Sequence, residues 1–457
     1  MKNRAVQHGG RWGRAVVVGG GYAGLVTARV LADHFSEVVI LEQSSVDERT
    51  GTHPHAPQGY HAHALLAKGG EVLERLFPGL RAELRAIGAP VFDYGEGISF
   101  LLPAGFAPRR RTGVEIQTFT RDELERRLRG KVLALPEVTL LSSTRCEGLG
   151  TTRPGAVNRV RYRTEDSEQP SEMEADLVVN TSGRSSALDG WLADLGLSVP
   201  AKRVVKAKIT YTSMDFDRPE SQPDFNLAYQ MTFAPHIPRG GVILAVERDR
   251  WMCSLIGFED QKPPTEDSAY LDFAKSLKNG RLAERIESRT NQGRTHRYTN
   301  VNNQWRLYHK MKDWPERLVA LGDAVCVFNP VYGQGLTVAA LEAELLHRTL
   351  AEHAARGNGL DGLSRGYQRA LARIVLSPWI LSSNSDLMWN PRRQPLTAKI
   401  AHWYNKHLFE VSVRDARVWS RFVRVANMVA DPAVLFHPTV VAKVVRQALF
   451  RGPRNSV

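Results

Sequence analysis

The stretch that decides the fold reads RAVVVGGGYAGLVTARVLADHFSEVVILEQ and spans residues 14–43. A β-branched run at 16–18 predicts a buried strand, the pattern through Ala32 predicts a helix, and the run at 38–41 predicts a second strand. Between the first strand and the helix, glycines stand at positions 19, 21 and 24. This order of strand, glycine turn, helix and strand predicts a βαβ unit that binds a dinucleotide.

Each glycine of this turn has its own physical purpose. Gly19 permits a tight turn after the strand, Gly21 lets backbone amides approach a pyrophosphate, and Gly24 lets the helix pack closely on the sheet. The phosphates then lie at the positive end of the helix. Glu42 ends the second strand and is placed to accept hydrogen bonds from ribose hydroxyls. Such an acid admits FAD or NAD and disfavours NADP, and this motif alone does not separate the first two.

Length and composition are those of a globular protein with two to three domains. The chain has 457 residues, of which 42% are hydrophobic and 24% are charged. Its three cysteines lie far apart, so we expect neither a disulfide framework nor a metal site, and a reducing cytoplasm fits best. No apolar run near the start approaches the ~20 residues of a membrane span, and we expect no signal peptide.

The net charge of +13 comes mostly from arginines scattered along the chain. Dispersed charge of this kind indicates a solvated surface, so we expect no nucleic-acid binding. The segment PTVVAKVVRQALFRG, residues 438–452, differs because it spaces apolar residues as a helix does, with basic residues between them. It predicts either peripheral membrane contact by this helix or an ordinary docking helix.

A second motif, ERLVALGDAVCVFNPVYGQGLTVAALEAELLHRTL at 316–350, separates the two cofactors. It predicts a short buried strand at 318–321 that ends at Gly322 and Asp323, then a loop and a helix from about Leu336. The motif resembles the second flavin motif of single-component-type FAD monooxygenases with the para-hydroxybenzoate hydroxylase fold. In that family the Gly-Asp carboxylate bonds the ribityl chain, so the resemblance implies this role for Asp323. FNPVYGQG is most similar to an actinobacterial subgroup that includes the polyether epoxidases.

The loop physics of this motif agrees with the resemblance. Backbone amides around Gly333, Gln334 and Gly335 begin a helix, where they would face the flavin pyrimidine edge. They would stabilise the negative charge that a reduced flavin carries there. A nicotinamide dehydrogenase has no need of that arrangement.

Two motifs between these anchors fit the same family. TFTRDELERRL places Arg121 at a helix start, where the family uses an arginine against the FAD pyrophosphate; an ordinary surface arginine is the alternative. ADLVVNTSGRSSALDGWL predicts a strand at 177–179 followed by Ser182, Gly183 and Arg184. The family usually has Asp-Gly at this position, so electrons would come either from NAD(P)H directly or through a partner flavin reductase.

Four imidazoles stand within THPHAPQGYHAH, residues 52–63, and suggest a metal site at first sight. Zinc would need further ligands at short spacing, and no cysteine is near. PQGYHAH is similar to the epoxidase-like loop that runs beside the cofactor, so the resemblance implies that His61 and His63 bond flavin phosphates or backbone carbonyls. Arg49 is the expected AMP contact, and Gln43 stands where many relatives carry a basic residue.

The motifs are widely separated, so we expect an α/β fold with a Rossmann-like FAD-binding domain of discontinuous segments, an inserted β-sheet substrate domain and a C-terminal helical region. The cofactor domain would comprise 1–90, 118–199 and 291–359. The β-rich stretches at 91–117 and 200–290 would form the substrate domain, and 360–457 would be helical, with an interruption around SPWILSSNSDLMWNP.

Aromatic residues offer candidates for the substrate wall. Trp251 and Phe258 lie in the expected sheet, and Trp379 and Trp389 lie in the helical region. Packing within the core is the alternative for all four. No nucleophile or metal cluster emerges, and Tyr332, beside the flavin loop, is the one catalytic candidate.

The resemblance implies an FAD-dependent monooxygenase that uses O2 to epoxidise or hydroxylate a hydrophobic polyketide or terpenoid intermediate through a flavin C4a-hydroperoxide. Two alternatives stay open: an FAD-dependent reductase or dehydrogenase of isoprenoid or polyketide double bonds, and an NAD-dependent Rossmann dehydrogenase. A halogenase is disfavoured because no Trp-x-Trp-x-Ile-Pro stretch occurs. The residues expected to contact FAD are Gly19, Gly21, Tyr22, Ala23, Gly24, Glu42, Gln43, Arg49, His61, Arg121, Gly322, Asp323, Pro330, Gly333, Gly335 and Leu336.

Overall fold

The computed structural model describes residues 11–45, 65–218, 224–287, 295–299, 302–390 and 394–450, together with 289, 291 and 293. The predictions for Arg49, His61 and His63 lie outside the described residues.

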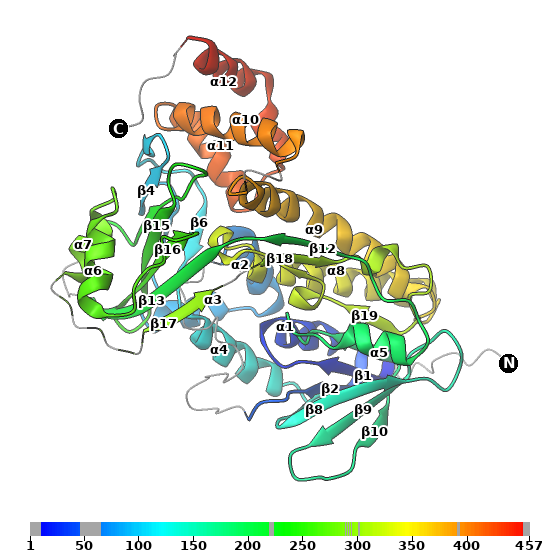
Figure 1. Cartoon of the computed structure of the whole chain (residues 1–457). Helices are drawn as coiled ribbons and strands as arrows, with labels where there is room; N and C mark the ends of the chain where they lie inside the picture. The colour runs from blue at the N-terminus through cyan, green and yellow to red at the C-terminus, as the bar shows by residue number, and fades with distance from the viewer. Residues whose placement is uncertain are drawn as a thin grey trace.

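The centre of the molecule is a parallel five-stranded sheet between layers of helices (Figure 1). Continuous β-branched runs form such strands because both faces are covered. The strand order is β19 (Leu318–Ala320), β11 (Leu177–Asn180), β1 (Trp12–Val18), β2 (Phe35–Leu41) and β7 (Val138–Leu141). β1 therefore pairs with β2 on one side and with β11 on the other, and β11 pairs with β19.

This pairing brings distant parts of the chain to one edge of the sheet. The glycine turn follows β1, the Ser-Gly-Arg stretch follows β11, and the Gly-Asp pair follows β19. In an open parallel sheet, ligands bind at the carboxyl ends of the strands, which is the edge these three turns share.

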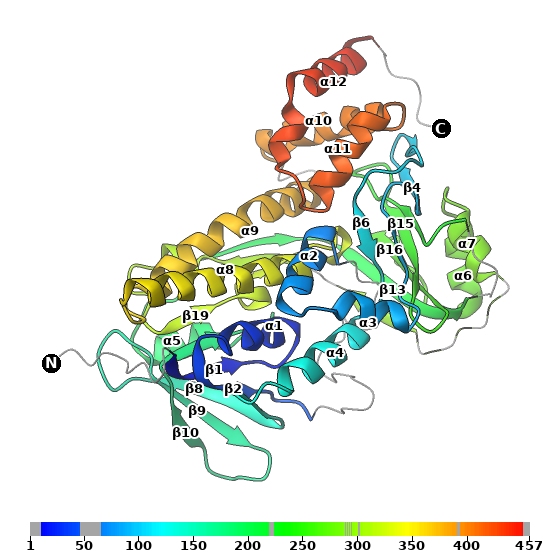
Figure 2. The same ribbon diagram turned by 180° about the vertical axis from the view of Figure 1, so that it is seen from behind.

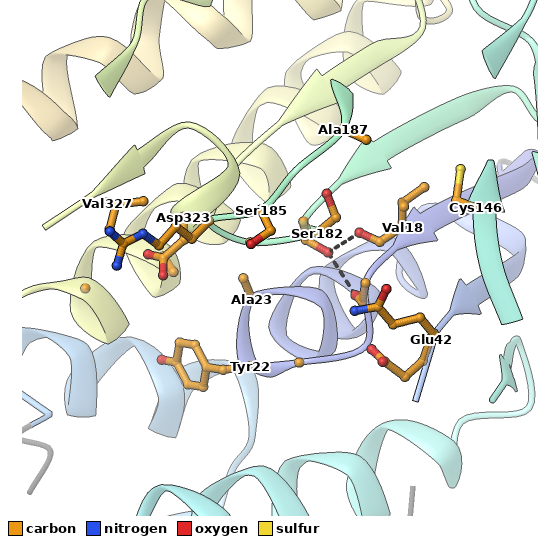
Figure 3. Close-up of a pocket in the computed structure, with 18 of the residues that line it drawn as sticks. Val18, Tyr22, Ala23, Glu42, Cys146, Ser182, Ser185, Ala187, Asp323 and Val327 are labelled. Carbon is orange, nitrogen blue, oxygen red and sulfur yellow. Dashed lines mark hydrogen bonds between the residues drawn. The ribbon is translucent and has the colours of Figure 1, made fainter. Parts of the chain in front are cut away.

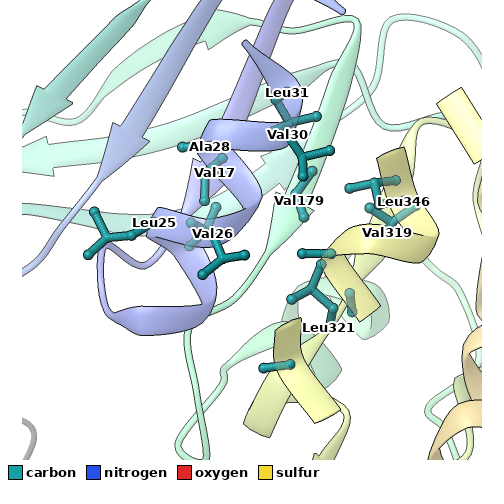
Figure 4. Close-up of a cluster of buried hydrophobic side chains, with 14 of the residues drawn as sticks. Val17, Leu25, Val26, Ala28, Val30, Leu31, Val179, Val319, Leu321 and Leu346 are labelled. Carbon is teal, nitrogen blue, oxygen red and sulfur yellow. The ribbon is translucent and has the colours of Figure 1, made fainter. Parts of the chain in front are cut away.

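The main hydrophobic core lies between this sheet and two helices, α1 (Tyr22–Leu31) and α8 (Gly335–Arg356). Val26 and Val30 of α1 belong to one cluster with the strand valines at 17, 179 and 319 and with Leu346 of α8 (Figure 4). Each of these side chains is at most 1% exposed. The convergence of the motifs is therefore held by one continuous apolar core.

A second, mostly antiparallel sheet has seven strands and stands beside the first domain. Its order is β17 (His296–Thr299), β13 (Ile209–Asp217), β16 (Arg250–Phe258), β15 (Arg239–Val246), β14 (Leu227–Gln230), β4 (Ile98–Leu102) and β5 (Gly105–Phe106). Helices α6 (Asp267–Lys275) and α7 (Arg281–Ile286) cover its outer face. The other face, with Phe100, Leu244 and Ile256, is turned toward the rest of the molecule.

Three smaller sheets and further helices complete the two domains. The sheets are β10 (Ser171–Glu174), β9 (Arg159–Thr164) and β8 (Thr144–Gly150); β12 (Lys202–Lys206), β18 (Asn302–Arg306) and β20 (Cys326–Val327); and β3 (Val91–Asp93) with β6 (Glu115–Gln117). The helices are α2 (Ala67–Leu76), α3 (Leu80–Ala86), α4 (Arg121–Leu133) and α5 (Leu188–Asp194).

Two strands lie on the other side of the domain boundaries expected from the sequence. β17 falls within the expected cofactor segment 291–359 but belongs to the seven-stranded sheet. β12 falls within the expected substrate segment 200–290 but pairs with β18. A residue pattern shows that a stretch is extended, whereas its domain depends on which strand it pairs with.

The C-terminal region is helical. α9 (Leu363–Leu387) leads along the cofactor domain to α10 (Leu396–Ser412), α11 (Ala416–Ala426) and α12 (Pro438–Phe450), which project at one end of the molecule (Figures 1 and 2). The expected interruption around 377–391 is wrong in its position, because α9 continues through Pro378 and ends only at Leu387. None of the described helices is long and apolar enough to cross a membrane.

Candidate flavin site

An elongated cavity of about 690 Å³ opens at the carboxyl edge of the parallel sheet. Figure 3 shows Glu42 on one side of it, Tyr22 and Asp323 on the other, and Ala23 and Ser182 between them. Of the expected cofactor contacts, twelve line this cavity: Gly19, Gly21, Tyr22, Ala23, Glu42, Gln43, Arg121, Asp323, Pro330, Gly333, Gly335 and Leu336.

The glycine turn is shaped as the sequence requires, and its members do different things. Gly19 has a φ of +105°, which favours glycine. A Cβ at Gly24 would overlap the carbonyl oxygen of Gly19, so this glycine lets α1 sit against the turn. A Cβ at Gly21 would meet nothing within 4 Å, because that position faces the cavity. Gly21 therefore leaves room for a ligand, whereas Gly24 lies behind the lining.

Gly322 also lies behind the cavity lining. Its φ is +67°, and a Cβ there would come within 3.0 Å of the Ala23 side chain. Its backbone N–H donates to Glu342 Oε2 on α8 at 2.6 Å. Burial, reinforced by the nearby Asp323, raises the pKa of Glu342 to about 8. A protonated carboxyl therefore supports the Gly-Asp turn at neutral pH.

Two helices begin at the cavity without a side-chain cap. α1 starts after Gly21, and α8 starts after Gln334, whose side chain makes no capping hydrogen bond. The first N–H groups of a helix lack intrahelical partners and attract negative charge. The cavity thus presents one positive helix end beside the glycine turn and another beside the 333–335 loop.

Two buried polar atoms of the lining have no hydrogen-bond partner among the described residues. They are the hydroxyl of Tyr22, which is 2% exposed, and Oε1 of Gln334, which is 4% exposed. Buried polar groups are normally hydrogen-bonded. Both atoms belong to residues that line the cavity.

Backbone N–H groups of the glycine turn and of Ser44 hold the Glu42 carboxylate in place. Its Oε2 accepts from the N–H of Gly20 at 2.7 Å, and its Oε1 accepts from the N–H of Ser44 at 2.8 Å. The side chain is buried and lines the cavity. Each carboxylate oxygen has a second lone pair, so the group can also accept from a ligand hydroxyl.

Arg121 and Asp323 both line the cavity and interact electrostatically. Thr120 caps α4 by accepting the N–H of Glu123 at 3.3 Å, which fixes Arg121 at the helix start. Burial raises the pKa of Asp323, although Arg121 and Arg184 act in the opposite direction. The site therefore has guanidinium charge for phosphates and a carboxyl for hydroxyl groups.

A buried network ties the loop at 330–335 to α9. The amide of Asn329 donates to both carboxylate oxygens of Asp386 at 3.0 Å, and the Tyr332 hydroxyl donates to Oδ1 at 3.1 Å. Asn303 Nδ2 donates to Oδ2 at 2.6 Å, and Tyr211 donates to the Asn329 amide oxygen at 2.5 Å. Burial raises the pKa of Asp386 to about 6. The network fixes the loop from behind.

A second, apolar cavity of about 140 Å³ lies between this loop and the seven-stranded sheet. The two cavities share Tyr298, Pro330 and Gly333 in their linings. No Asp, Glu, Lys or Arg is among the described residues that line it. They are Leu65, Leu66, Tyr94, Phe100, Ile116, Tyr211, Leu227, Tyr229, Val242, Leu244, Ser254, Ile256, Tyr298, Pro330, Val331, Tyr332, Gly333 and Asn427.

None of the four aromatic substrate candidates lines this cavity. Trp251 is fully buried against α6 and α7, because side chains alternate along β16 and only the even-numbered ones face inward. Phe258 is on the inward face of β16, but Trp389 covers it, with the two ring centres 4.2 Å apart. Trp379 packs beside Trp305 with ring centres 5.6 Å apart. Packing, the alternative reading, holds for all four.

The sequence interpretation also missed residues. The β8 and β9 hairpin brings a group of side chains to the cavity end near Glu42, namely Thr144, Arg145, Cys146, Glu147 and Arg161. Nothing in that hairpin's sequence marks it as part of a site. Asp386 had a weak signal, because it is the one acid within the otherwise uncharged stretch 374–391.

Comparison with known proteins agrees with this geometry. Residues 14–375 match the FAD binding domain family. The chain is 30% identical over 390 residues to Protein Rv3254 of Mycobacterium tuberculosis, which covers 82% of this chain and 80% of that protein. The chain therefore belongs to the FAD binding domain family of flavin-dependent monooxygenases.

Solved structures show the same fold. A triple mutant of the flavin-dependent brominase Bmp2 aligns with a TM-score of 0.64 at 13% identity, covering 94% of this chain and 99% of that chain. The p-nitrophenol 4-monooxygenase PnpA of Pseudomonas putida aligns with a TM-score of 0.62 at 17% identity, covering 90% and 96%. The fold is that of para-hydroxybenzoate hydroxylase, and the protein is an FAD-dependent oxidoreductase, which sets aside NAD as the resident cofactor.

Proposed function

We propose that this enzyme transfers one oxygen atom from O2 to an apolar, uncharged substrate, either to the double bond of an alkene or to an electron-rich ring. The observation that carries the proposal is the junction of the two cavities. The larger cavity has the polar groups that a flavin dinucleotide needs, and the smaller one is mostly apolar and without charged residues in its described lining. They meet at Pro330 and Gly333, so a substrate would lie against the end of the cofactor site.

FAD, when bound and reduced with electrons from NAD(P)H, would activate O2, so that one oxygen atom of O2 goes to the substrate and the other leaves as water. In this proposal the pyrophosphate lies at the start of α1 with Arg121, and Glu42 accepts from the ribose. Asp323 binds the ribityl chain, and the amides that begin α8 face the flavin ring. The uncapped starts of α1 and α8 support this placement, because Gly21, Tyr22, Gln334 and Gly335 line the cavity.

In this proposal the residues of the chain hold FAD, orient the substrate and exclude water, and none of them reacts. Leu66, Leu244 and Ile256 would exclude water from the smaller cavity, because their apolar side chains line it. Tyr332 acts as a positioning residue in this proposal. Its hydroxyl donates to Asp386, and burial raises its pKa well above the usual value, so it does not serve as a base.

The chemistry of the smaller cavity favours a neutral substrate. Its polar side chains are five tyrosines, Ser254 and Asn427, and burial raises the pKa of both Tyr94 and Tyr229. Neutral hydroxyls can hydrogen-bond a keto or hydroxyl group, but they cannot form an ion pair with a carboxylate. The uncharged lining suits an apolar part of a polyketide or terpenoid intermediate, because a cavity of about 140 Å³ has room for one small group of it. The similarity of FNPVYGQG to the polyether epoxidases favours an alkene.

Isotope labelling tests the proposal. FAD-loaded enzyme is given isotopically labelled O2, NAD(P)H with or without a flavin reductase, and a panel of apolar alkenes and phenols. We expect one labelled oxygen atom per product molecule by mass spectrometry, with O2 consumed in step with product. Turnover of a double bond without O2 would instead establish the reductase alternative.

A matched pair of variants locates the reaction. Val242→Phe places a larger side chain in the smaller cavity, whereas Val204→Phe adds the same ring at a position that is 48% exposed on β12. We expect Val242→Phe to lose product formation by about tenfold or more while retaining FAD, because the substrate loses its space. Equal activity of the two variants would contradict the assignment of this cavity.

A further inference from the structure

Exposed apolar surface is concentrated on the C-terminal helices. Among the described residues, thirteen large hydrophobic side chains are exposed, and ten of them lie between residues 376 and 450. Single exposed hydrophobic residues are ordinary, but a gathering of them marks an interaction surface. These helices also project at one end of the molecule (Figures 1 and 2).

The most regular part of this surface is a row on α10, which we call the α10 stripe: Leu396, Ile400 and Trp403. These residues are 73%, 57% and 46% exposed. Their spacing of four and three residues puts them on one side of the helix. The opposite side of α10 is already used, because Leu408 and Phe409 are buried against neighbouring elements.

Positive charge gathers in the same region. Residues 363–450 contain thirteen Lys and Arg against four Asp and Glu, so they carry +9 of the net charge of +13. The basic residues themselves are dispersed as expected, since this region has 13 of the 61 Lys and Arg of the chain, and its excess of positive charge reflects its few acids. On α10 itself, Lys399 and Lys406 are exposed and lie three residues after Leu396 and Trp403, along one edge of the α10 stripe.

We propose that the α10 stripe docks this protein on an anionic lipid surface. A helix that lies in a membrane interface inserts apolar side chains on one face and places lysines beside the headgroups. Tryptophan prefers that interfacial depth, and a lysine can lay its stem on the apolar layer while its ammonium group reaches the phosphates. The α10 stripe has all three features.

The charge decides between a lipid surface and a second copy of this chain. A self-association through this face would bring two regions of like charge together, which opposes docking. An anionic bilayer is attracted by the same charge. Three strongly exposed side chains on a projecting helix also suit insertion into lipid headgroups.

The helices that would meet the lipid also border the smaller cavity. Asn427, which ends α11, lines that cavity, and Trp419 of α11 contacts the lining residue Phe100 with ring centres 5.4 Å apart. His402 of α10 stacks on Phe233 at 4.3 Å. Docking would therefore bring the smaller cavity close to the membrane, where apolar molecules dissolve. The docking itself does not depend on the proposed reaction.

Vesicle flotation tests the proposal with the full-length, FAD-loaded protein. Vesicles of phosphatidylcholine alone are compared with vesicles that also contain phosphatidylglycerol. We expect flotation with the anionic vesicles and about tenfold less with neutral ones or at high salt. The triple variant Leu396→Ser, Ile400→Ser, Trp403→Ser should lose binding by about tenfold or more, because it removes the inserted apolar area.

A matched control uses the remaining three exposed hydrophobic residues. Phe106, Val199 and Val204 are 50%, 54% and 48% exposed, and their triple serine variant should float as the wild type does. The proposal is overturned if the wild type does not float with anionic vesicles, or if both triple variants lose binding equally. It is also overturned if light scattering shows a dimer that only the α10 stripe variant dissociates. Each result is obtained without turnover, so it stands apart from the test of the proposed reaction.

Discussion

At the scale of single residues, the two neighbouring glycines of the turn can be separated experimentally. Gly21 has φ and ψ of −75° and −170°, which any residue adopts, and open space where a Cβ would stand. Gly24 has the carbonyl oxygen of Gly19 in that place. One glycine serves the ligand and the other serves the fold.

We therefore expect Gly21→Ala to weaken FAD binding by about tenfold or more, because the methyl group occupies the ligand's space. The apoprotein should be unchanged or more stable by up to about 1 kcal/mol, since alanine suits this backbone conformation. Flavin fluorescence titration and urea unfolding measure the two quantities. Gly24→Ala is the contrast, and it should destabilise the apoprotein itself. Loss of apoprotein stability in Gly21→Ala would contradict the reading of that position.

Glu342 gives a pH dependence whose sign follows from its pKa. The folded protein raises that pKa from 4.5 to about 8, so the native state keeps a proton that the unfolded chain has released. The contribution of Glu342 to stability is therefore largest at low pH and is lost as the pH rises from 4.5 to 8.

Glu342→Gln replaces the protonated acid with a neutral group of similar shape. At pH 8 the variant should be more stable than the wild type by about 1–3 kcal/mol, and near pH 5 the two should agree within about 0.5 kcal/mol. Urea unfolding of both proteins at one FAD concentration, over a pH series, measures the difference. A constant difference across the series would show that Glu342 does not titrate in this range.

At the scale of elements, α9 and the loop at 330–335 form a unit through Asp386. The carboxylate accepts from Asn303, Asn329 and Tyr332, and Tyr332 lines the smaller cavity. Removing a shared acceptor leaves buried donors without partners, which costs more than the loss of one hydrogen bond.

Asp386→Ala should lower the free energy of unfolding by about 2–4 kcal/mol because it leaves three buried donors unsatisfied. Asp386→Asn keeps the shape and one acceptor oxygen, so its loss should be smaller. Leu381→Ala, on the exposed side of the same helix, is the control and should stay within about 0.5 kcal/mol. Denaturant unfolding followed by circular dichroism ranks the three, and a control as unstable as Asp386→Ala would assign the effect to the helix.

At the scale of the whole molecule, the cofactor cavity is built from segments that lie far apart in the chain, from Val18 to Ala339. Ligand binding to such a cavity stabilises the native arrangement, because the unfolded chain has no site. FAD at about 100 times its Kd should raise the free energy of unfolding by about 2.7 kcal/mol. Thermal unfolding of apoprotein with added FAD measures the shift. AMP should give a smaller one, and no shift with FAD would contradict the site.

The sequence predicted the parallel sheet and most of the cofactor cavity because those features depend on local patterns. A glycine turn after a β-branched strand, an acid at the next strand end, and a Gly-Asp pair are each readable within thirty residues. The direction in which a side chain of a central strand points is not readable in this way. Trp251 and Ile256 lie on the same strand, and only the pairing of β16 with its neighbours, covered by α6 and α7, decides which one faces the cavity.

Pro330 and Gly333 lie between the two cavities and line both of them. A molecule bound in the smaller cavity would contact the same backbone that FAD contacts from the larger cavity. By thermodynamic reciprocity, if the small molecule changes the affinity for FAD by some factor, FAD changes the affinity for the small molecule by the same factor. We therefore expect the flavin absorption bands of the FAD-loaded protein to shift when an apolar molecule binds in the smaller cavity, which a difference spectrum measures.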